Sequence, residues 1–114
     1  MILVIGPMAA GKREFVSGQL GYGPEEMADG RLDDCPVIFN VQDLVFRDPA
    51  QVPALLPQLT AKAVVVINEV GAGVIPLERG SREARDACGR LSVLLAQAAA
   101  EVYRVVCGIP LRIK

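Results

Sequence analysis

A glycine-framed segment near the N-terminus carries the residue types that bind phosphate. In its G-x-x-x-x-G-K spacing, the glycines let backbone N–H groups converge on an anion, and the lysine adds a positive charge for β- and γ-phosphates. We therefore predict a nucleotide-binding P-loop, with the lysine as its catalytic residue; an ordinary glycine-rich turn is the alternative. This segment, called the phosphate loop below, is Gly6-Pro7-Met8-Ala9-Ala10-Gly11-Lys12.

The residue that follows the lysine departs from the motif. A Ser or Thr normally stands there and binds Mg²⁺ through its hydroxyl, but this chain has Arg13. Arginine has no lone pair for a metal and its charge repels one, so we expect Arg13 to contact a phosphate directly. Asn40 ends the second predicted strand where a carboxylate would suit magnesium, and Asp43 is more simply a solvated residue. No residue is therefore assigned to a metal, and Mg²⁺ is a doubtful cofactor.

Two further groups of residues suit phosphate chemistry. Glu69 follows the most apolar predicted strand, where ligands of open α/β sheets collect. We expect it either to orient water or a substrate hydroxyl as a catalytic residue, or to cap a neighbouring loop. Arg82 and Arg85 share one side of a predicted helix, which suits phosphate binding and equally suits surface pairing with Glu83 or Asp86.

Short apolar runs and one long amphipathic segment indicate the elements that position these residues. Buried strands are predicted at 1–5, 36–40, 63–67 and 101–107, with a short one at 111–113. A helix is predicted at 12–20, and a longer one from Ser81, which we expect to be its N-cap. Between the first two strands we expect a loop at 25–34 with one helical turn at most. Residues 41–47 are expected to start a helix or to be irregular. Asp48 is expected to be an N-cap, followed by a helix at 50–60 that Pro53 and Pro57 shorten or break.

The alternation of strands and helices predicts an α/β fold. We expect one domain over residues 1–114, with a P-loop NTPase-like, mostly parallel sheet and helices on both faces in three layers. The 114 residues are 52% hydrophobic and 22% charged with a net charge of −1, which argues against disorder and against binding to nucleic acid or anionic membranes. No apolar run predicts a membrane span. Three unpaired-looking cysteines indicate a reducing, cytoplasmic location, and the absence of histidine argues against zinc.

The last third of the chain carries a more specific pattern. Its residues are Asn68-Glu69-Val70-Gly71-Ala72-Gly73-Val74-Ile75-Pro76, then Arg82, Arg85-Asp86 and Gly89-Arg90, then Gly108-Ile109 and Arg112-Ile113-Lys114. This pattern resembles the adenosylcobinamide kinase/adenosylcobinamide-phosphate guanylyltransferase family of cobalamin biosynthesis. The resemblance implies a RecA-like P-loop enzyme that uses GTP or ATP, acts on the corrinoid adenosylcobinamide and assembles as a homo-oligomer, with a trimer as the expected form.

The family's guanylyl transfer, as the resemblance implies it, passes through a guanylylated histidine. A phosphoramidate intermediate needs an imidazole nucleophile, and this sequence contains no histidine. We therefore expect a shortened relative that binds nucleotide or phosphate without that step. An active kinase that uses Glu69 or Asp43, and a non-catalytic oligomeric interaction subunit, are the alternatives.

Overall fold

The computed structural model describes residues 1–69 and 79–114, with side chains from residue 82 onward in the second range. Two of its helices, η1 and η2, are 3₁₀ helices. In chain order the elements are β1 (Ile2–Gly6), α1 (Lys12–Gly18), η1 (Pro24–Glu26), β2 (Met27–Asp29), β3 (Val37–Phe39), α2 (Val41–Arg47), η2 (Pro49–Gln51), α3 (Val52–Thr60), β4 (Val64–Asn68), α4 (Arg79–Ala98), β5 (Glu101–Val106) and β6 (Ile109–Arg112).

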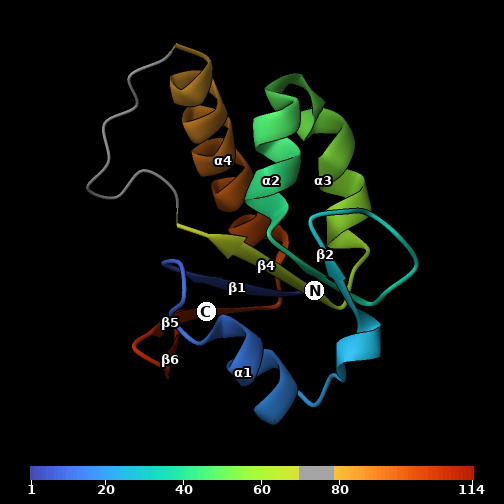
Figure 1. Ribbon diagram of the computed structural model, residues 1–114, viewed down its shortest axis with the longest axis vertical. Helices are drawn as coiled ribbons and strands as arrows, with labels where there is room; N and C mark the ends of the chain where they lie inside the picture. The colour runs from blue at the N-terminus through green and yellow to red at the C-terminus, as the bar shows by residue number, and fades with distance from the viewer. Residues whose placement is uncertain (70–78) are drawn as a thin grey trace.

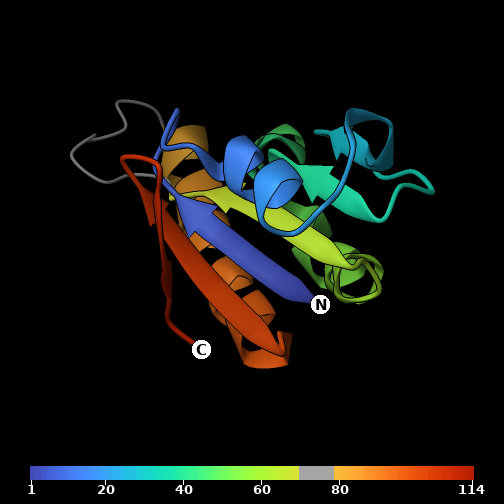
Figure 2. The same ribbon diagram turned by 90° about the horizontal axis from the view of Figure 1, so that it is seen from below.

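One sheet in the order β2-β3-β4-β1-β5-β6 forms the middle layer (Figure 2). The first five of these strands are parallel, and β6 pairs antiparallel with β5 at the edge. β1 lies between β4 and β5, so Ile2–Ile5 have neighbours on both sides and on both faces, which explains their continuous apolar run. The predicted α/β fold with a mostly parallel sheet is confirmed.

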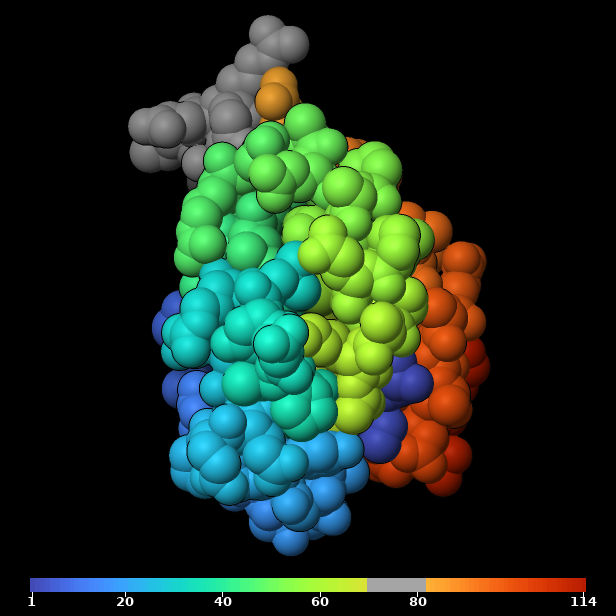
Figure 3. Space-filling model, turned by 90° about the vertical axis from the view of Figure 1, so that its right-hand side faces the viewer, coloured from blue at the N-terminus to red at the C-terminus, as the bar shows by residue number. Residues whose placement is uncertain are grey.

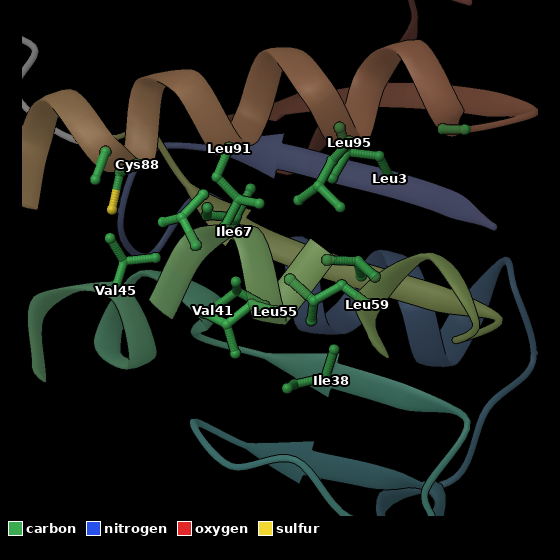
Figure 4. Close-up of a cluster of buried hydrophobic side chains, with 14 of the residues drawn as sticks. Leu3, Ile38, Val41, Val45, Leu55, Leu59, Ile67, Cys88, Leu91 and Leu95 are labelled. Atoms are coloured by element: carbon green, nitrogen blue, oxygen red, sulfur yellow. The ribbon is translucent and has the colours of Figure 1, made fainter. Parts of the chain in front are cut away.

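Helices cover both faces of the sheet (Figure 1). Because successive side chains of a strand point to opposite faces, Val4 packs with Phe15 and Val16 of α1 on one face. Leu3 packs on the other face, under α2, α3 and α4. Figure 4 shows this second core, in which Leu91 and Leu95 of α4 lie above the sheet.

The amphipathic helix α4 buries most of the predicted apolar face. Its buried side chains are Ala84, Ala87, Cys88, Leu91 and Leu95, and Ala99 follows just after its end. Leu94 and Ala98 continue the three- and four-residue spacing of this face, but they are exposed because each lies about 100° around the helix axis from the buried residue that follows it, Leu95 or Ala99. The N-cap prediction was wrong: α4 begins at Arg79, so Ser81 lies within its first turn.

The sequence prediction missed one strand entirely. The expected loop at 25–34 contains η1 and the strand β2, which pairs with β3 at the edge of the sheet. Only Ala28 of its three residues is buried, so no hydrophobic alternation marks the strand. In Figure 3 the cyan part of the chain, to which β2 belongs, covers this side between α1 in blue and the green helices.

The region between β3 and β4 is more helical than expected. Residues 41–47 form the complete helix α2, and Asp48 caps η2 as predicted, its side chain accepting the backbone N–H of Ala50 at 3.2 Å. α3 is short, with nine residues, but it continues through Pro57. Pro57 has no N–H to donate to the carbonyl of Pro53, so the helix lacks this hydrogen bond, but it is not broken there.

A tight hairpin closes the sheet at β6. Cys107 and Gly108 have φ values of 52° and 73°, which is typical of a two-residue turn that matches the twist of antiparallel strands. The last strand therefore begins at Ile109, two residues before the predicted start.

None of the helices in the described parts of the chain is long and apolar enough to cross a membrane.

Replacing Leu91 by alanine tests the packing of α4 on the sheet. Leu91 is fully buried, so Leu91→Ala is expected to lower the free energy of unfolding by about 2–5 kcal/mol through lost contacts and a residual cavity. Val93 on the same helix is 57% exposed, and Val93→Ala should change it by less than about 0.5 kcal/mol. Urea unfolding followed by circular dichroism measures both; equal losses would contradict the described packing.

Candidate functional site

The backbone of the phosphate loop has the geometry of an anion-binding concavity. It connects β1 to α1, and φ is 56° at Ala9 and 95° at Gly11, while Ala10 between them has no positive φ. Alternation between left- and right-handed residues turns successive N–H groups toward one point. A left-handed alanine is uncommon and costs conformational energy, so the loop keeps this shape against a local preference.

The β5–β6 hairpin lies directly behind this loop. The backbone N–H of Gly108 donates to the carbonyl of Ala10 at 2.7 Å, and Figure 2 shows the red turn beside the blue loop. A Cβ atom on Gly6 would lie 2.4 Å from the carbonyl oxygen of Val105, and one on Gly11 would lie 2.9 Å from Cα of Gly108. Both motif glycines are therefore needed for backbone contact, in addition to any ligand.

Lys12 begins α1 beneath the loop and is buried, with 8% of its surface exposed. Its ammonium group donates to the carbonyl oxygen of Pro7, within the same loop. Burial lowers the pKa of Lys12 below its ordinary value, and the negative charge of Glu69 partly opposes this shift. The lysine is thus desolvated and aimed at the loop, as a phosphate-binding cation requires.

A pocket of about 240 Å³ opens beside the loop. β3 and β4 contribute to it from their carboxyl ends, as expected for an open α/β sheet. Met8 is 81% exposed at its rim. The lining residues are Met8, Ala9, Ala10, Gly11, Lys12, Arg13, Glu14, Phe39, Asn40 and Asn68.

Arg13 points along the pocket toward the β2 edge. Its guanidinium lies 4.6 Å from the ring centroid of Phe39, a cation–π contact, and 3.8 Å from a carboxylate oxygen of Asp29. It also reaches the sulfur of Met27. Arg13 therefore lines the pocket next to Lys12, but it is held at the side by β2 and β3.

A chain of hydrogen bonds joins the ends of three strands at this edge. The Asn40 amide donates to Asp29 at 2.5 Å and accepts from Gln42 at 3.1 Å, and the Gln42 carbonyl accepts the backbone N–H of Asn68 at 3.0 Å. Asn40 has φ of 56°, a conformation that asparagine tolerates better than most residues. The network fixes the wall of the pocket opposite the loop.

Asp29 and Gln42 are site residues that sequence reasoning missed. Asp29 was hidden because β2 carries no strand pattern, and Gln42 because a polar residue in a first helical turn suggests solvent. Gln42 is in fact buried. The available signal was its place two residues after Asn40, which follows a strand end.

The donor set does not fit a protein-held magnesium ion. The position that normally provides a hydroxyl holds the guanidinium of Arg13, and the Asp29 carboxylate is shared between Arg13 and Asn40. Among the described residues, no three His, Cys, Asp or Glu side chains converge to hold a metal. Asp43 does not line the pocket; its carboxylate lies near Gly30.

Glu69 lies on the other side of Lys12 and is paired with Arg104. The two carboxylate oxygens accept from Nε and Nη2 of Arg104 at 2.5 and 2.9 Å, and the Glu69 backbone N–H donates to the carbonyl of Gly6 at 2.8 Å. Neither of the roles expected for Glu69 included this ion pair. The signal for Arg104 was a charged residue in the interior of a predicted strand, between Tyr103 and Val105.

The structure does not bring the two predicted helix arginines to the phosphate loop. Arg82 and Arg85 lie in the first turns of α4, on the face of the sheet opposite α1 (Figure 1). Neither lines the pocket beside the loop. Of the segment Asn68–Pro76 in the family pattern, Asn68 ends β4 and Glu69 follows it, and residues 70–76 fall outside the described residues.

A family model described as cobinamide kinase / cobinamide phosphate guanyltransferase matches residues 36–113, which is about two thirds of the chain. The chain belongs to this family. The match confirms the resemblance seen in the last third, and it covers Asn40, Glu69, Arg104 and the β5–β6 hairpin. The match begins after the phosphate loop, so the assignment of the loop as a phosphate site rests on the geometry of the loop itself.

Curated relatives agree with this assignment. Bifunctional adenosylcobalamin biosynthesis protein CobU of Escherichia coli, and its namesake in Salmonella typhimurium, are each 52% identical over 54 residues, which cover 47% of this chain and 30% of the relative. Bifunctional adenosylcobalamin biosynthesis protein CobP of Pseudomonas aeruginosa is 30% identical over 90 residues, covering 73% of this chain and 52% of that protein. The chain thus spans between about a third and half of the length of these relatives.

The desolvated lysine gives this cobinamide kinase family member a measurable stability signature. Burial of the Lys12 charge disfavours folding, and the Pro7 carbonyl it contacts belongs to an exposed residue that water can reach. Lys12→Met is therefore expected to raise the free energy of unfolding by roughly 0.5–2 kcal/mol, as when a functional residue is replaced at a strained site. Lys62→Met is the contrast, because Lys62 bonds the carbonyls of Asp33 and Cys35 and its loss should destabilise.

The same lysine predicts a pH dependence. With its folded pKa below its unfolded pKa, the unfolded state binds more protons between the two values, so stability should rise with pH as it passes through the folded pKa of Lys12 toward 10.5. The Lys12→Met variant should lack this rise. Chemical denaturation at several alkaline pH values measures it, and an identical pH profile in both proteins would contradict a desolvated lysine.

Proposed function

We propose that this cobinamide kinase family member binds the phosphates of GTP or ATP in the phosphate loop and does not carry out guanylyl transfer through a histidine. The observation that supports it best is the alternating backbone at Ala9, Ala10 and Gly11 above the buried Lys12. Converging N–H groups and a desolvated cation form one anion site, and polyphosphate is the ligand that fills such a site in P-loop proteins.

The roles within the site follow from position. Backbone N–H groups of the loop would hold the β- and γ-phosphates, and Lys12 would neutralise the charge between them. Arg13 is within the same pocket, and it would leave Asp29 for a phosphate oxygen, since a charge-assisted bond to phosphate is stronger than an exposed ion pair at 3.8 Å. In this assignment Arg13 neutralises the phosphate charge that Mg²⁺ neutralises in other P-loop proteins.

The proposal that guanylyl transfer is absent follows from the residues that the chain contains. A covalent nucleotide on nitrogen needs an imidazole nucleophile, and the 114 residues contain no histidine. The corrinoid adenosylcobinamide is the second ligand that family membership suggests for this chain, and a homo-oligomer is the assembly it suggests.

A kinase restricted to the phosphorylation step is the second candidate, because Glu69 acts electrostatically on Lys12 and its carboxylate would orient a substrate hydroxyl. Incubation with adenosylcobinamide and either nucleotide, followed by mass spectrometry, tests it. Phosphorylated corrinoid would support a kinase, and its absence beside an active control enzyme would leave binding alone.

Calorimetric titration with GTP and with ATP tests the proposed binding directly. We expect saturable binding of at least one nucleotide below about 1 mM, the ordinary upper range for enzyme substrates, and a loss of at least about tenfold in Lys12→Met. Arg112→Met is the control, because Arg112 lies on β6 and does not line the pocket. No binding of either nucleotide at millimolar concentration would overturn the proposal and favour an interaction subunit.

Substitution of Arg13 tests the absence of a protein-held metal. The natural chain should bind nucleotide with affinities that differ by less than about threefold between Mg²⁺ and EDTA. Arg13→Ser restores the hydroxyl of the motif, so Mg²⁺ should then raise affinity about tenfold or more. A strong Mg²⁺ dependence in the unaltered chain would contradict the role given to Arg13.

A further inference from the structure

The pair formed by Glu69 and Arg104 has no explanation in stability alone. The Arg104 side chain is 46% exposed and that of Glu69 is 27% exposed. Ion pairs this accessible to water contribute little to stability. Arg104 is an exposed residue of β5 and lies opposite Ile5 of the central strand β1. The ion pair is thus weakly stabilising, yet it is placed beside the middle of the sheet.

The geometry of the pair places it between the sheet and the loop. Arg104 shares a face of β5 with Val102, on the side that carries α4. From there it reaches across the end of β1 to Glu69, which follows β4 and is anchored through its backbone to Gly6. Both oxygens of the carboxylate are engaged by the guanidinium. In this arrangement the carboxylate of Glu69 is directed toward Arg104.

The pair lies close to Lys12 at the base of the phosphate loop. The Glu69 backbone N–H donates to the carbonyl of Gly6 at 2.8 Å, and a Cβ atom on Gly6 would lie 3.5 Å from Cδ of Lys12. At this proximity the negative charge of Glu69 opposes the lowering of the Lys12 pKa by burial. A free carboxylate near a desolvated ammonium would attract it strongly, because burial leaves few competing partners. Lys12 would then be drawn from the loop carbonyl of Pro7, and the uncompensated negative charge would repel phosphate.

We propose that Arg104 is a positioning residue for the phosphate loop: its bidentate pair with Glu69 keeps that carboxylate from capturing Lys12, so the ammonium stays available to phosphate. This inference rests on the proposed nucleotide binding. It also gives Glu69 a defined resting state, because a carboxylate with both oxygens bound to arginine must leave Arg104 before it accepts a proton from a substrate hydroxyl.

A double-mutant cycle tests the proposal in the full chain. Arg104→Met keeps the length of the side chain and removes the charge, so nucleotide affinity should fall about tenfold by calorimetry. Combining it with Glu69→Gln removes the freed carboxylate, and affinity should return to within about threefold of the unaltered chain. Arg112→Met is the matched control: Arg112 pairs with Glu101 at 3.4 Å on the neighbouring strands, and its loss should leave affinity unchanged.

A readout without nucleotide separates this inference from the proposed function. Nuclear magnetic resonance of the Lys12 side chain, assigned by its loss in Lys12→Met, should show a raised lysine pKa in Arg104→Met and a lowered one in the double variant. If the unaltered chain binds no nucleotide but these shifts occur, the proposed function fails and the positioning role of Arg104 stands.

The proposal is overturned by either of two results. An unchanged Lys12 pKa in folded Arg104→Met would show that the carboxylate does not reach the lysine. A loss of affinity that Glu69→Gln fails to restore would show that Arg104 acts through folding or by touching the nucleotide itself. Thermal unfolding of each variant confirms that the comparison is made between folded proteins.

Discussion

The close contact between the phosphate loop and the β5–β6 hairpin is the constraint on which the site depends. Gly6 and Gly11 lie against the backbone of Val105 and Gly108, and a hydrogen bond from Gly108 holds the carbonyl of Ala10. A loop of this length has many conformations in isolation. Here the hairpin removes most of them, which lets Ala9 remain left-handed and keeps the N–H groups convergent before any ligand arrives.

The charges around this loop are arranged as two separate pairs. Arg13 is held by Asp29 on the side of β2, and Arg104 holds Glu69 on the side of β5. Lys12 lies between them with its ammonium on a loop carbonyl. Each arginine is therefore paired with a carboxylate beside the loop. This arrangement gives a coherent account of why a guanidinium is tolerated where a hydroxyl usually stands.

Sequence reasoning predicted the parts of the fold that depend on burial. The strands β1, β3, β4 and β5 and the buried face of α4 follow from apolar runs and helical spacing, because the side chains that mark them have nowhere else to go. β2 was missed because this edge strand is held by backbone hydrogen bonds on one side, and of its three residues Ala28 is fully buried and Met27 only partly. The candidate site likewise has one part that the sequence predicted and one that it did not. The phosphate loop is visible in the order of residues, whereas the pairing of Glu69 with Arg104 joins positions 35 residues apart through a strand order that local sequence does not encode.

The central place of β1 has a consequence for synthesis of the chain. Ile2 is paired with Val64 on one side and with Glu101 on the other. β1 is therefore synthesised well before either of its partners, and such distant pairing slows folding. During translation the apolar segment Ile2–Ile5 has no neighbouring strand until β4 has left the ribosome, and the phosphate loop has no hairpin behind it until β5 and β6 emerge. The nascent chain is thus expected to need protection of β1, by a chaperone or by the ribosome surface, until β4 and β5 have been synthesised.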